Sequence, residues 1–335
     1  MEIIREVPPL RQFRQKLWQL SRKVGFVPTM GALHEGHLSL LKLAARENDD
    51  VIISIYVNPT QFRFDEDFDS YPKTLAKDIE AIQRLNRDLA SEPQSGMINC
   101  LFTPTTKTLF PDTPNATAMP DHGSFVTITP LGEILEGASR PVFFKGVATV
   151  CLKLFNIVNP DVVYLGQKDI QQTVVLRKMV SDFHIDTEIR VGPTVREPDG
   201  LALSSRNVYL GSRRRKVALV LYHALTIAER SYHDGGRSRD EVLRPALEFA
   251  NREALEQVKL LPRERAMFIV DYISMADPNN MEELDIVNEK EGAILSGAII
   301  MKTLEEPQIH EDCGSNRGQN SVRLIDNIIL DPVTS

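Results

Sequence analysis

The sequence predicts an α/β protein in which a doubly wound parallel sheet is followed by a second, smaller α+β domain. Between residues 24 and 191, short apolar runs typical of strands alternate with longer amphipathic segments typical of helices. Parallel sheets with helical crossovers have this order. After Pro193 the pattern changes to two long helical segments and then to β-rich runs. We therefore place one domain at residues 1–193 and another at residues 194–335.

The first predicted unit is a strand, a polar loop and a helix. The apolar run Val24–Val27 stops at Pro28, and Leu38–Ala45 has the spacing of an amphipathic helix. A second strand is expected at Val51–Val57, because this β-branched run is continuous enough to be covered on both faces. Asn58-Pro59 ends it.

The same alternation resumes after Lys145. Apolar residues recur at helical spacing from Val147 to Val158, and Asn159-Pro160 stops that helix. We then expect a strand, a helix and a further strand, at residues 161–165, 169–180 and 185–191.

The second domain should begin with a polar loop that runs to Asn207. Its expected helices lie near residues 214–232 and 239–257, and its β-rich runs at residues 267–274 and 293–301. Two stretches without periodicity, residues 91–96 and 304–320, are expected to be surface loops.

Composition favours a globular protein with a small-molecule partner. Of 335 residues, 42% are hydrophobic and 25% are charged, which gives little support to a disordered or fibrous chain. The formal net charge of -7 lacks the basic footprint of a protein that binds nucleic acid or an anionic membrane.

The cysteines and the hydropathy pattern indicate a reducing compartment. Cys100, Cys151 and Cys313 form no CxxC pair, which argues against a disulfide framework or a cysteine zinc site. No run approaches the about 18 apolar residues that span a bilayer, and Met1–Leu20 carries charges throughout. We therefore expect a cytoplasmic protein that is not inserted in a membrane.

The first segment that could carry chemistry is Pro28–His37, between a predicted strand and a predicted helix. Its histidines, His34 and His37, could donate hydrogen bonds to phosphate oxygens, while Gly31 and Gly36 allow the backbone to approach a ligand. This suits a nucleoside triphosphate. A pair of surface histidines or an HxxH metal pair are the alternatives, although a metal needs more ligands and no third one is evident nearby.

Two further polar segments follow predicted strands. In Gly166-Gln167-Lys168-Asp169, the lysine could hold a phosphate and the aspartate a ribose hydroxyl; an ordinary glycine turn with an N-cap aspartate is the alternative. Leu203–Asn207 combines Ser204, Ser205 and Arg206 in a loop that could close over a triphosphate, or that could be a solvated turn. The order of all three segments favours a nucleotide site.

These segments resemble the pantoate–β-alanine ligase family of the nucleotidyltransferase superfamily, which also contains class I aminoacyl-tRNA synthetases. His34–His37 matches the superfamily's HxGH (HIGH-type) signature, and Leu203–Asn207 lies where synthetases carry a mobile KMSKS-type loop. The resemblance covers nearly the whole chain and implies a Rossmann-like first domain. The stretches more specific to the family are residues 57–62, 71–74, 135–141, 166–172, 195–207, 270–272 and 323–327.

The resemblance implies that the chain makes pantothenate from pantoate, β-alanine and ATP, as a ligase of pantothenate and coenzyme A biosynthesis. Pantoyl adenylate forms first, with release of pyrophosphate, and the β-alanine amine then displaces AMP. It also implies that Mg²⁺ accompanies ATP, that the protein is a homodimer, and that residues 1–193 bind ATP and pantoate while residues 194–335 form a lid.

The resemblance further implies a role for each matching residue. Residues from Met30 and Gly31 to His37 would line the triphosphate, with His37 as the proton donor. Gly166, Gln167, Lys168 and Asp169 would hold phosphate and ribose, Val195 would meet adenine through its backbone, and Leu203, Ser204, Ser205 and Arg206 would close on pyrophosphate. His34, His37, Lys168 and Arg206 would be catalytic. Gln61 and Gln172 would bind pantoate, with Gln61 also near β-alanine, and no protein side chain is assigned to a metal.

The residue types suit this chemistry independently of the family. Pantoate is already ionised at neutral pH, so its attack on the α-phosphorus needs no base, and the site has chiefly to neutralise charge and align the groups. Histidine, lysine and arginine donors do this. Neutral amides such as Gln61 and Gln172 can bind pantoate without capturing the acyl adenylate, as a lysine amine could.

One departure from the family pattern leaves alternatives open. Where the family has a Gly-His-Phe-like run after Arg140-Pro141, this chain has Val142-Phe143-Phe144, so the histidine is missing. A non-catalytic nucleotide-binding relative is therefore one alternative. A plain nucleotidyltransferase is another, against which Gln61 and Gln172 argue.

Overall fold

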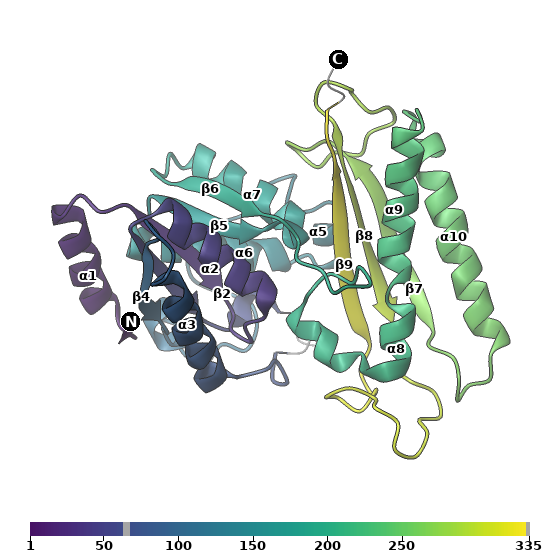
Figure 1. Ribbon diagram of the computed structural model, residues 1–335, viewed down its shortest axis with the longest axis horizontal. Helices are drawn as coiled ribbons and strands as arrows, with labels where there is room; N and C mark the ends of the chain where they lie inside the picture. The colour runs from purple at the N-terminus through teal and green to yellow at the C-terminus, as the bar shows by residue number, and fades with distance from the viewer. Residues whose placement is uncertain (63–67, 333–335) are drawn as a thin grey trace. The chain divides into compact units, whose positions relative to one another are not determined.

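The protein is described by a computed structural model that covers residues 1–62 and 68–332 and forms two compact units (Figure 1). The units are Met1–Thr194 and Val195–Ser335. The first contains a six-stranded parallel sheet with helices, and the second a three-stranded antiparallel sheet with helices. The predicted fold class is confirmed.

The sheet of the first unit turns back on itself at its centre. In space its strands follow the order β1-β4-β3-β2-β5-β6, and every adjacent pair is parallel. From β2 the chain continues to one side through β3 and β4, then to the other side through β5 and β6. Such a switch point opens a crevice at the carboxyl ends of the central strands. The strands are β1 Glu2–Ile4, β2 Val24–Thr29, β3 Asp50–Ile55, β4 Met97–Phe102, β5 Val162–Gly166 and β6 Glu188–Gly192.

Helices cover both faces of this sheet. On one face, Val51 and Ile53 of β3 join a buried cluster with residues of α2 and α3. Because side chains alternate along a strand, Phe26 of β2 points to the other face, where its ring packs edge-on against Phe155 of α6 with centroids 6.4 Å apart. The helices are α1 Val7–Gln19, α2 Glu35–Glu47, α3 Leu75–Leu89, α4 Thr106–Leu109, α5 Glu136–Ser139, α6 Phe143–Val158 and α7 Ile170–Asp182, with 3-10 turns η1 Pro59–Gln61 and η2 Gln167–Asp169.

Several predicted boundaries were wrong. Strand β2 continues through Pro28 to Thr29. Proline is tolerated there because β5 pairs only with Gly25 and Phe26, so no strand on that side requires a hydrogen bond from residue 28. Helix α2 begins at Glu35 instead of Leu38, and β6 begins at Glu188 instead of Ile185. Elements β1, α1, α3 and β4 were not predicted.

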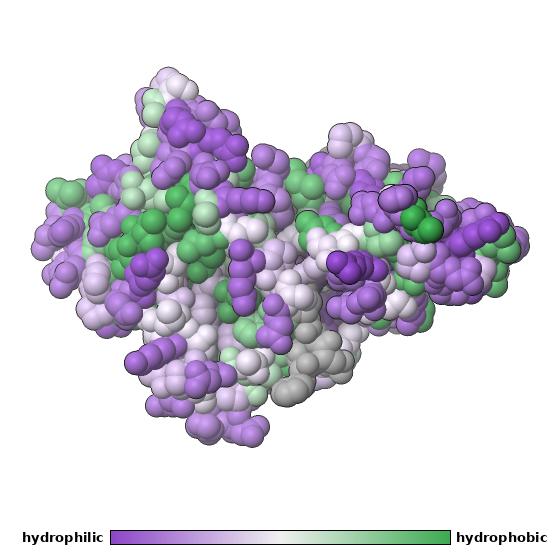
Figure 2. Space-filling view, turned by 90° about the horizontal axis from the view of Figure 1, so that it is seen from below, coloured by the Kyte–Doolittle hydropathy of each residue, from purple (hydrophilic) through white to green (hydrophobic). Residues whose placement is uncertain are grey.

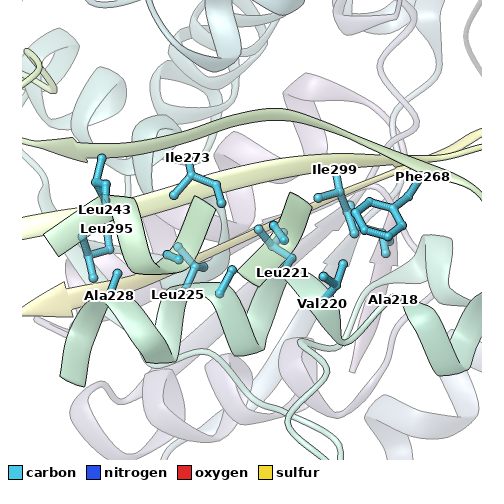
Figure 3. Packing of buried hydrophobic residues seen from close by; sticks show 14 of the residues in the cluster. Ala218, Val220, Leu221, Leu225, Ala228, Leu243, Phe268, Ile273, Leu295 and Ile299 are labelled. Carbon is cyan, nitrogen blue, oxygen red and sulfur yellow. The ribbon is translucent and has the colours of Figure 1, made fainter. Parts of the chain in front are cut away.

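The second unit packs two long helices on one face of its antiparallel sheet. Helices α9 and α10 contact the strands, and Leu225, Leu243, Ile273, Leu295 and Ile299 meet in the layer between them (Figure 3). The predicted helix at 214–232 is two helices, although the sequence contains no glycine or proline at the break. Strand β9 was not predicted. The elements are η3 Ser205–Tyr209, α8 Gly211–Val217, α9 Val220–His233, α10 Arg239–Lys259, β7 Phe268–Ala276, β8 Ala293–Met301 and β9 Val322–Leu330.

Both non-periodic stretches are largely exposed loops without helix or strand, as expected. The longer one, residues 304–320, is fixed at its base. The fully buried guanidinium of Arg214 donates to the backbone oxygens of Asn320 (2.7 Å) and Cys313 (3.4 Å), and Arg213 pairs with Glu311. The loop is therefore anchored to the start of α8.

The distribution of polar and apolar residues on the surface is that of an ordinary globular protein, as the composition predicts. The face in Figure 2 carries hydrophilic residues interspersed with smaller apolar areas, which is ordinary for a globular protein. Within residues 1–62 and 68–332, no helix combines the length and apolar character needed to cross a bilayer.

Candidate active site

The histidine segment, Pro28–His37, contains a tight left-handed turn directly after β2. Gly31 has φ 84° and Ala32 has φ 50°. A Cβ atom at residue 31 would also lie 3.0 Å from Cγ2 of Ile55. Glycine is needed there both for its backbone conformation and for space. The turn directs the chain from the end of β2 into α2.

Backbone hydrogen bonds fix both histidine rings at the start of α2. His34 is the N-cap residue, and its Nδ1 accepts from the Gly36 N–H at 3.2 Å. The Nδ1 atom of His37 accepts from the His34 N–H at 3.3 Å, and the ring centroids are 4.1 Å apart. Because a backbone N–H can only donate, each Nδ1 carries a lone pair and each neutral ring carries its hydrogen on Nε2.

The environment keeps both rings uncharged. Desolvation by burial is the largest cause that lowers the pKa of His34 to about 4 and that of His37 to about 3. The positive charge of Lys168 lowers both pKa values further, and each ring is only partly exposed. In the unliganded protein at neutral pH, His37 is therefore a hydrogen-bond donor through Nε2, and it holds no imidazolium proton to transfer.

The lysine segment, residues 166–169, follows β5, the strand next to β2 in the sheet. Strand β5 ends at Gly166, and Lys168 lies in η2 with its Nζ 3.7 Å from a carboxylate oxygen of Asp169. Asp169 is at the N-cap position of α7, but its side chain makes no capping hydrogen bond. The alternative of a purely structural N-cap aspartate therefore has no support.

Gly166 has no structural need to be glycine. Its φ is -83°, and only Cδ1 of Leu40 would come within 4 Å of an added Cβ, at 3.8 Å. By contrast, a Cβ at Gly146 would lie 2.3 Å from the backbone oxygen of Thr60, where α6 packs on η1. The absence of a side chain at residue 166 therefore leaves a space beside the backbone that few protein atoms approach.

Gln61 lies beside the histidine segment. It ends η1, which follows β3, and its amide oxygen accepts from Nδ2 of Asn58 at 3.1 Å. Its amide nitrogen is 3.1 Å from the sulfur of Met30, and its backbone oxygen accepts from Arg140 at 3.2 Å. Gln61 and Met30 therefore lie together, because they follow the neighbouring strands β3 and β2.

The position of the missing histidine is occupied by an aromatic ring that covers an arginine. The guanidinium carbon of Arg140 lies 3.9 Å from the ring centroid of Phe143, the first residue of α6. Arg140 also lies 3.6 Å from Glu136. The Phe143 ring therefore stacks on Arg140, whose guanidinium also donates to the Gln61 backbone oxygen.

The two adjacent glutamines of α7 have different surroundings. Gln171 is buried and donates to the backbone oxygens of Leu131 (2.9 Å) and Ile134 (2.8 Å), while accepting from the Glu136 N–H at 3.1 Å. Gln172 is partly exposed. Sequence reasoning missed this support of residues 131–136, because nothing local distinguishes the two amides.

The second unit contains the remaining candidates, which lie close to one another. The Leu203 N–H donates to the backbone oxygen of Val195 at 3.0 Å, and Oγ of Ser204 caps η3 by accepting from the Arg206 N–H at 3.2 Å. Arg196 forms a two-pronged ion pair with Asp326, with a shortest distance of 2.6 Å. The family-type stretches at residues 195–207 and 323–327 are thereby joined.

A histidine metal site is not supported. Among the described residues, no group of three or more histidine, cysteine, aspartate or glutamate side chains could hold a metal ion. Both Nδ1 atoms of the HxGH segment are already engaged by backbone N–H groups.

Comparison with known proteins identifies the family. A model of the family described as Pantoate-beta-alanine ligase matches residues 2–329. A pantothenate synthetase from Chloroflexus aggregans is 42% identical over 330 residues, covering 98% of this chain and 100% of that protein. The chain belongs to the pantoate-beta-alanine ligase family. Its activity is the joining of pantoate and β-alanine to form pantothenate.

Solved structures of this family share the fold. Pantothenate synthetase from Thermus thermophilus matches with a TM-score of 0.75 and 34% identity, covering 99% of this chain and 100% of that one. A pantoate-beta-alanine ligase from Francisella tularensis, complexed with beta-gamma ATP and beta-alanine, matches with a TM-score of 0.69 and 32% identity, covering 98% and 97%. The family match decides for the ligase over a plain nucleotidyltransferase.

The depressed pKa of His37 predicts a contribution to stability that depends on pH. In the unfolded chain this ring binds a proton near pH 6.5, but in the folded chain only near pH 3. The neutral ring therefore contributes fully above pH 6.5, and the contribution is lost as the pH falls below that value. We expect His37→Asn to remove it, so that the free energy of unfolding falls less between pH 6.5 and 4, by up to about 3 kcal/mol.

Urea denaturation of both proteins across this pH range checks the effect. Both proteins contain the other histidines, so the difference between the two pH curves reports residue 37. Parallel pH curves for wild type and variant would show that His37 is not held neutral by the fold.

Proposed function

We propose that the ligase reaction runs in two steps, with ATP bound at the carboxyl ends of β2, β3 and β5. A carboxylate oxygen of pantoate attacks the α-phosphorus of ATP, and the bond to pyrophosphate breaks. The amine of β-alanine, in its neutral form after loss of a proton to solvent, then forms the carbon–nitrogen bond as the bond to AMP breaks, and the second amine proton also leaves to solvent. The observation that carries this proposal is the pair of neutral histidines beside Lys168 at the switch point of the sheet.

The polar groups at this edge suit a triphosphate. Two Nε2–H donors, one lysine charge and the start of α2 present hydrogen atoms and positive potential to the phosphates. The candidate side chains Met30, His34, His37, Gln61, Lys168, Asp169 and Gln172 are all partly exposed, so a ligand can reach them. That the Francisella relative is complexed with beta-gamma ATP and beta-alanine supports the same ligands here.

The proposed roles follow the hydrogen-bonding capacity of each group. His34, His37 and Lys168 hold the phosphates as charge moves to pyrophosphate, and Gly166, Gln167 and Asp169 hold phosphate and ribose. Gln61 and Gln172 bind pantoate, and Gln61 lies near β-alanine. Asn58 orients the Gln61 amide so that its nitrogen faces the weak acceptor Met30 and is available to a stronger one.

In the second unit, the proposed roles are adenine contact by the Val195 backbone and closure by Leu203, Ser204, Ser205 and Arg206. These four residues of the loop are partly exposed, whereas the flanking Leu201 and Tyr209 are buried, so the loop is held at both ends. In this proposal, residues 1–193 bind ATP and pantoate, and residues 194–335 form a lid.

Magnesium, the homodimer and the cytoplasmic location are also proposed from the family. The described residues contain no cluster of carboxylates and histidines that would bind a metal alone. Mg²⁺ would be carried by the triphosphate of ATP.

Pyrophosphate release tests the proposed order of steps. With ATP and Mg²⁺ present, we expect release only when pantoate is added, and AMP release with pantothenate formation only when β-alanine follows. Release without pantoate would indicate a different acceptor. No release under any of these conditions would favour a non-catalytic relative.

Gly166 provides a test of the site that is separate from folding. We expect Gly166→Ala to leave the free energy of unfolding within about 1 kcal/mol of wild type, because the methyl group has room. ATP affinity should fall by about tenfold or more, because the methyl group would occupy space close to the nucleotide. Calorimetric titration with ATP and urea denaturation measure the two effects.

Gly146→Ala is the matched control, because its methyl group would meet the Thr60 backbone and should lower stability. Wild-type ATP affinity in Gly166→Ala would remove Gly166 from the nucleotide site.

A further inference from the structure

Asp78 is a buried acidic residue of α3. Its side chain accepts hydrogen bonds from the backbone of the histidine segment. Its side chain is 3% exposed. One carboxylate oxygen accepts from the Leu33 N–H at 2.9 Å and the other from the Ala32 N–H at 3.1 Å. The hydroxyl of Thr74 donates to the same group, at 3.1 and 3.2 Å. Both oxygens therefore act as acceptors for the turn.

The turn that Asp78 holds is conformationally costly. Gly31 and Ala32 both have positive φ, a backbone conformation that is unfavourable for alanine. The N–H groups of Ala32 and Leu33 point to the same side and converge on one anionic group, as successive amides do in anion-binding turns. The carboxylate of Asp78 fills this position from within the protein.

The held turn leads directly into the two histidines. Leu33 precedes the N-cap residue His34, whose own N–H donates to Nδ1 of His37. A shift of the Ala32–Leu33 peptide would move the N-cap and therefore both rings. We propose that Asp78 is a positioning residue for adenylate formation: it fixes the turn that orients the Nε2–H donors of His34 and His37.

This inference rests on the proposed roles of the two histidines. Because Asp78 is buried and its oxygens are occupied, it acts through the backbone and does not itself contact ATP. A purely structural role would lower stability without changing the rate at saturating substrates. A positioning role lowers the rate of adenylate formation at saturating ATP and pantoate, because donor alignment matters most as charge develops.

The chain offers a matched control. Asp50 is also a buried acidic residue, 2% exposed and bonded to Arg22 and Asn99, but it lies at the amino end of β3, opposite the end from which Gln61 follows. Asp78→Asn and Asp50→Asn make the same chemical change. The first alters the turn before His34, and the second does not.

The test compares single-turnover adenylation in wild type, Asp78→Asn, Thr74→Val and Asp50→Asn. We expect Asp78→Asn to slow adenylation at saturating substrates by about 10- to 100-fold. Thr74→Val, which removes only the hydroxyl that orients the carboxylate, should slow it several-fold. Asp50→Asn should stay within about twofold of wild type even if its stability falls. Thr74→Val keeps the test decisive if Asp78→Asn does not fold.

A second readout is independent of catalysis. Relaxation of the turn should admit water to the rings, so the pKa of His34, measured by NMR, should rise toward its ordinary value in Asp78→Asn and stay low in Asp50→Asn. Unchanged rates together with an unchanged pKa in Asp78→Asn would overturn the positioning role. If wild type releases no pyrophosphate with pantoate, the proposed function fails instead, and the pKa comparison alone decides the role of Asp78.

Discussion

The site depends on two backbone N–H groups at the start of α2 that donate to histidine side chains. The Gly36 N–H reaches Nδ1 of His34, and the His34 N–H reaches Nδ1 of His37. These bonds place the hydrogen of each neutral ring on Nε2, and burial together with Lys168 keeps the rings uncharged. The fold thus orients two hydrogen-bond donors before any ligand binds. Donors that are already oriented stabilise the transition state without a free-energy cost for reorganisation during the reaction.

The sheet topology supplies the other groups. Because β3 and β5 flank β2, the residues that follow these three strands meet at one edge, which brings Gln61 and Lys168 to the histidine segment. Close packing at Gly146 and the Arg140–Phe143 stack hold η1, and therefore Gln61, in place. Phe143, which takes the place of the histidine expected from the family pattern, stacks on Arg140.

Sequence patterns predicted the parallel sheet and the polar segments at the strand ends, because apolar runs, glycines and charged side chains are local signals. They missed the start of α2, since histidine is not among the usual N-cap residues. They also missed Asp78, which lies 46 residues from its partner Ala32, and the burial of Gln171 beside Gln172. Tautomers and long-range carboxylate contacts depend on tertiary structure, and no spacing rule encodes them.

The tautomer and the charge of the two histidines can be measured directly. Two-bond ¹H–¹⁵N NMR correlation of the unliganded protein, assigned with His34→Asn and His37→Asn, measures both. We expect each ring to carry its hydrogen on Nε2 and an unprotonated Nδ1, with ¹⁵N chemical shifts that stay constant from pH 8 to about 5.5. A hydrogen on Nδ1 of either ring, or titration of either ring near pH 6.5, would contradict it.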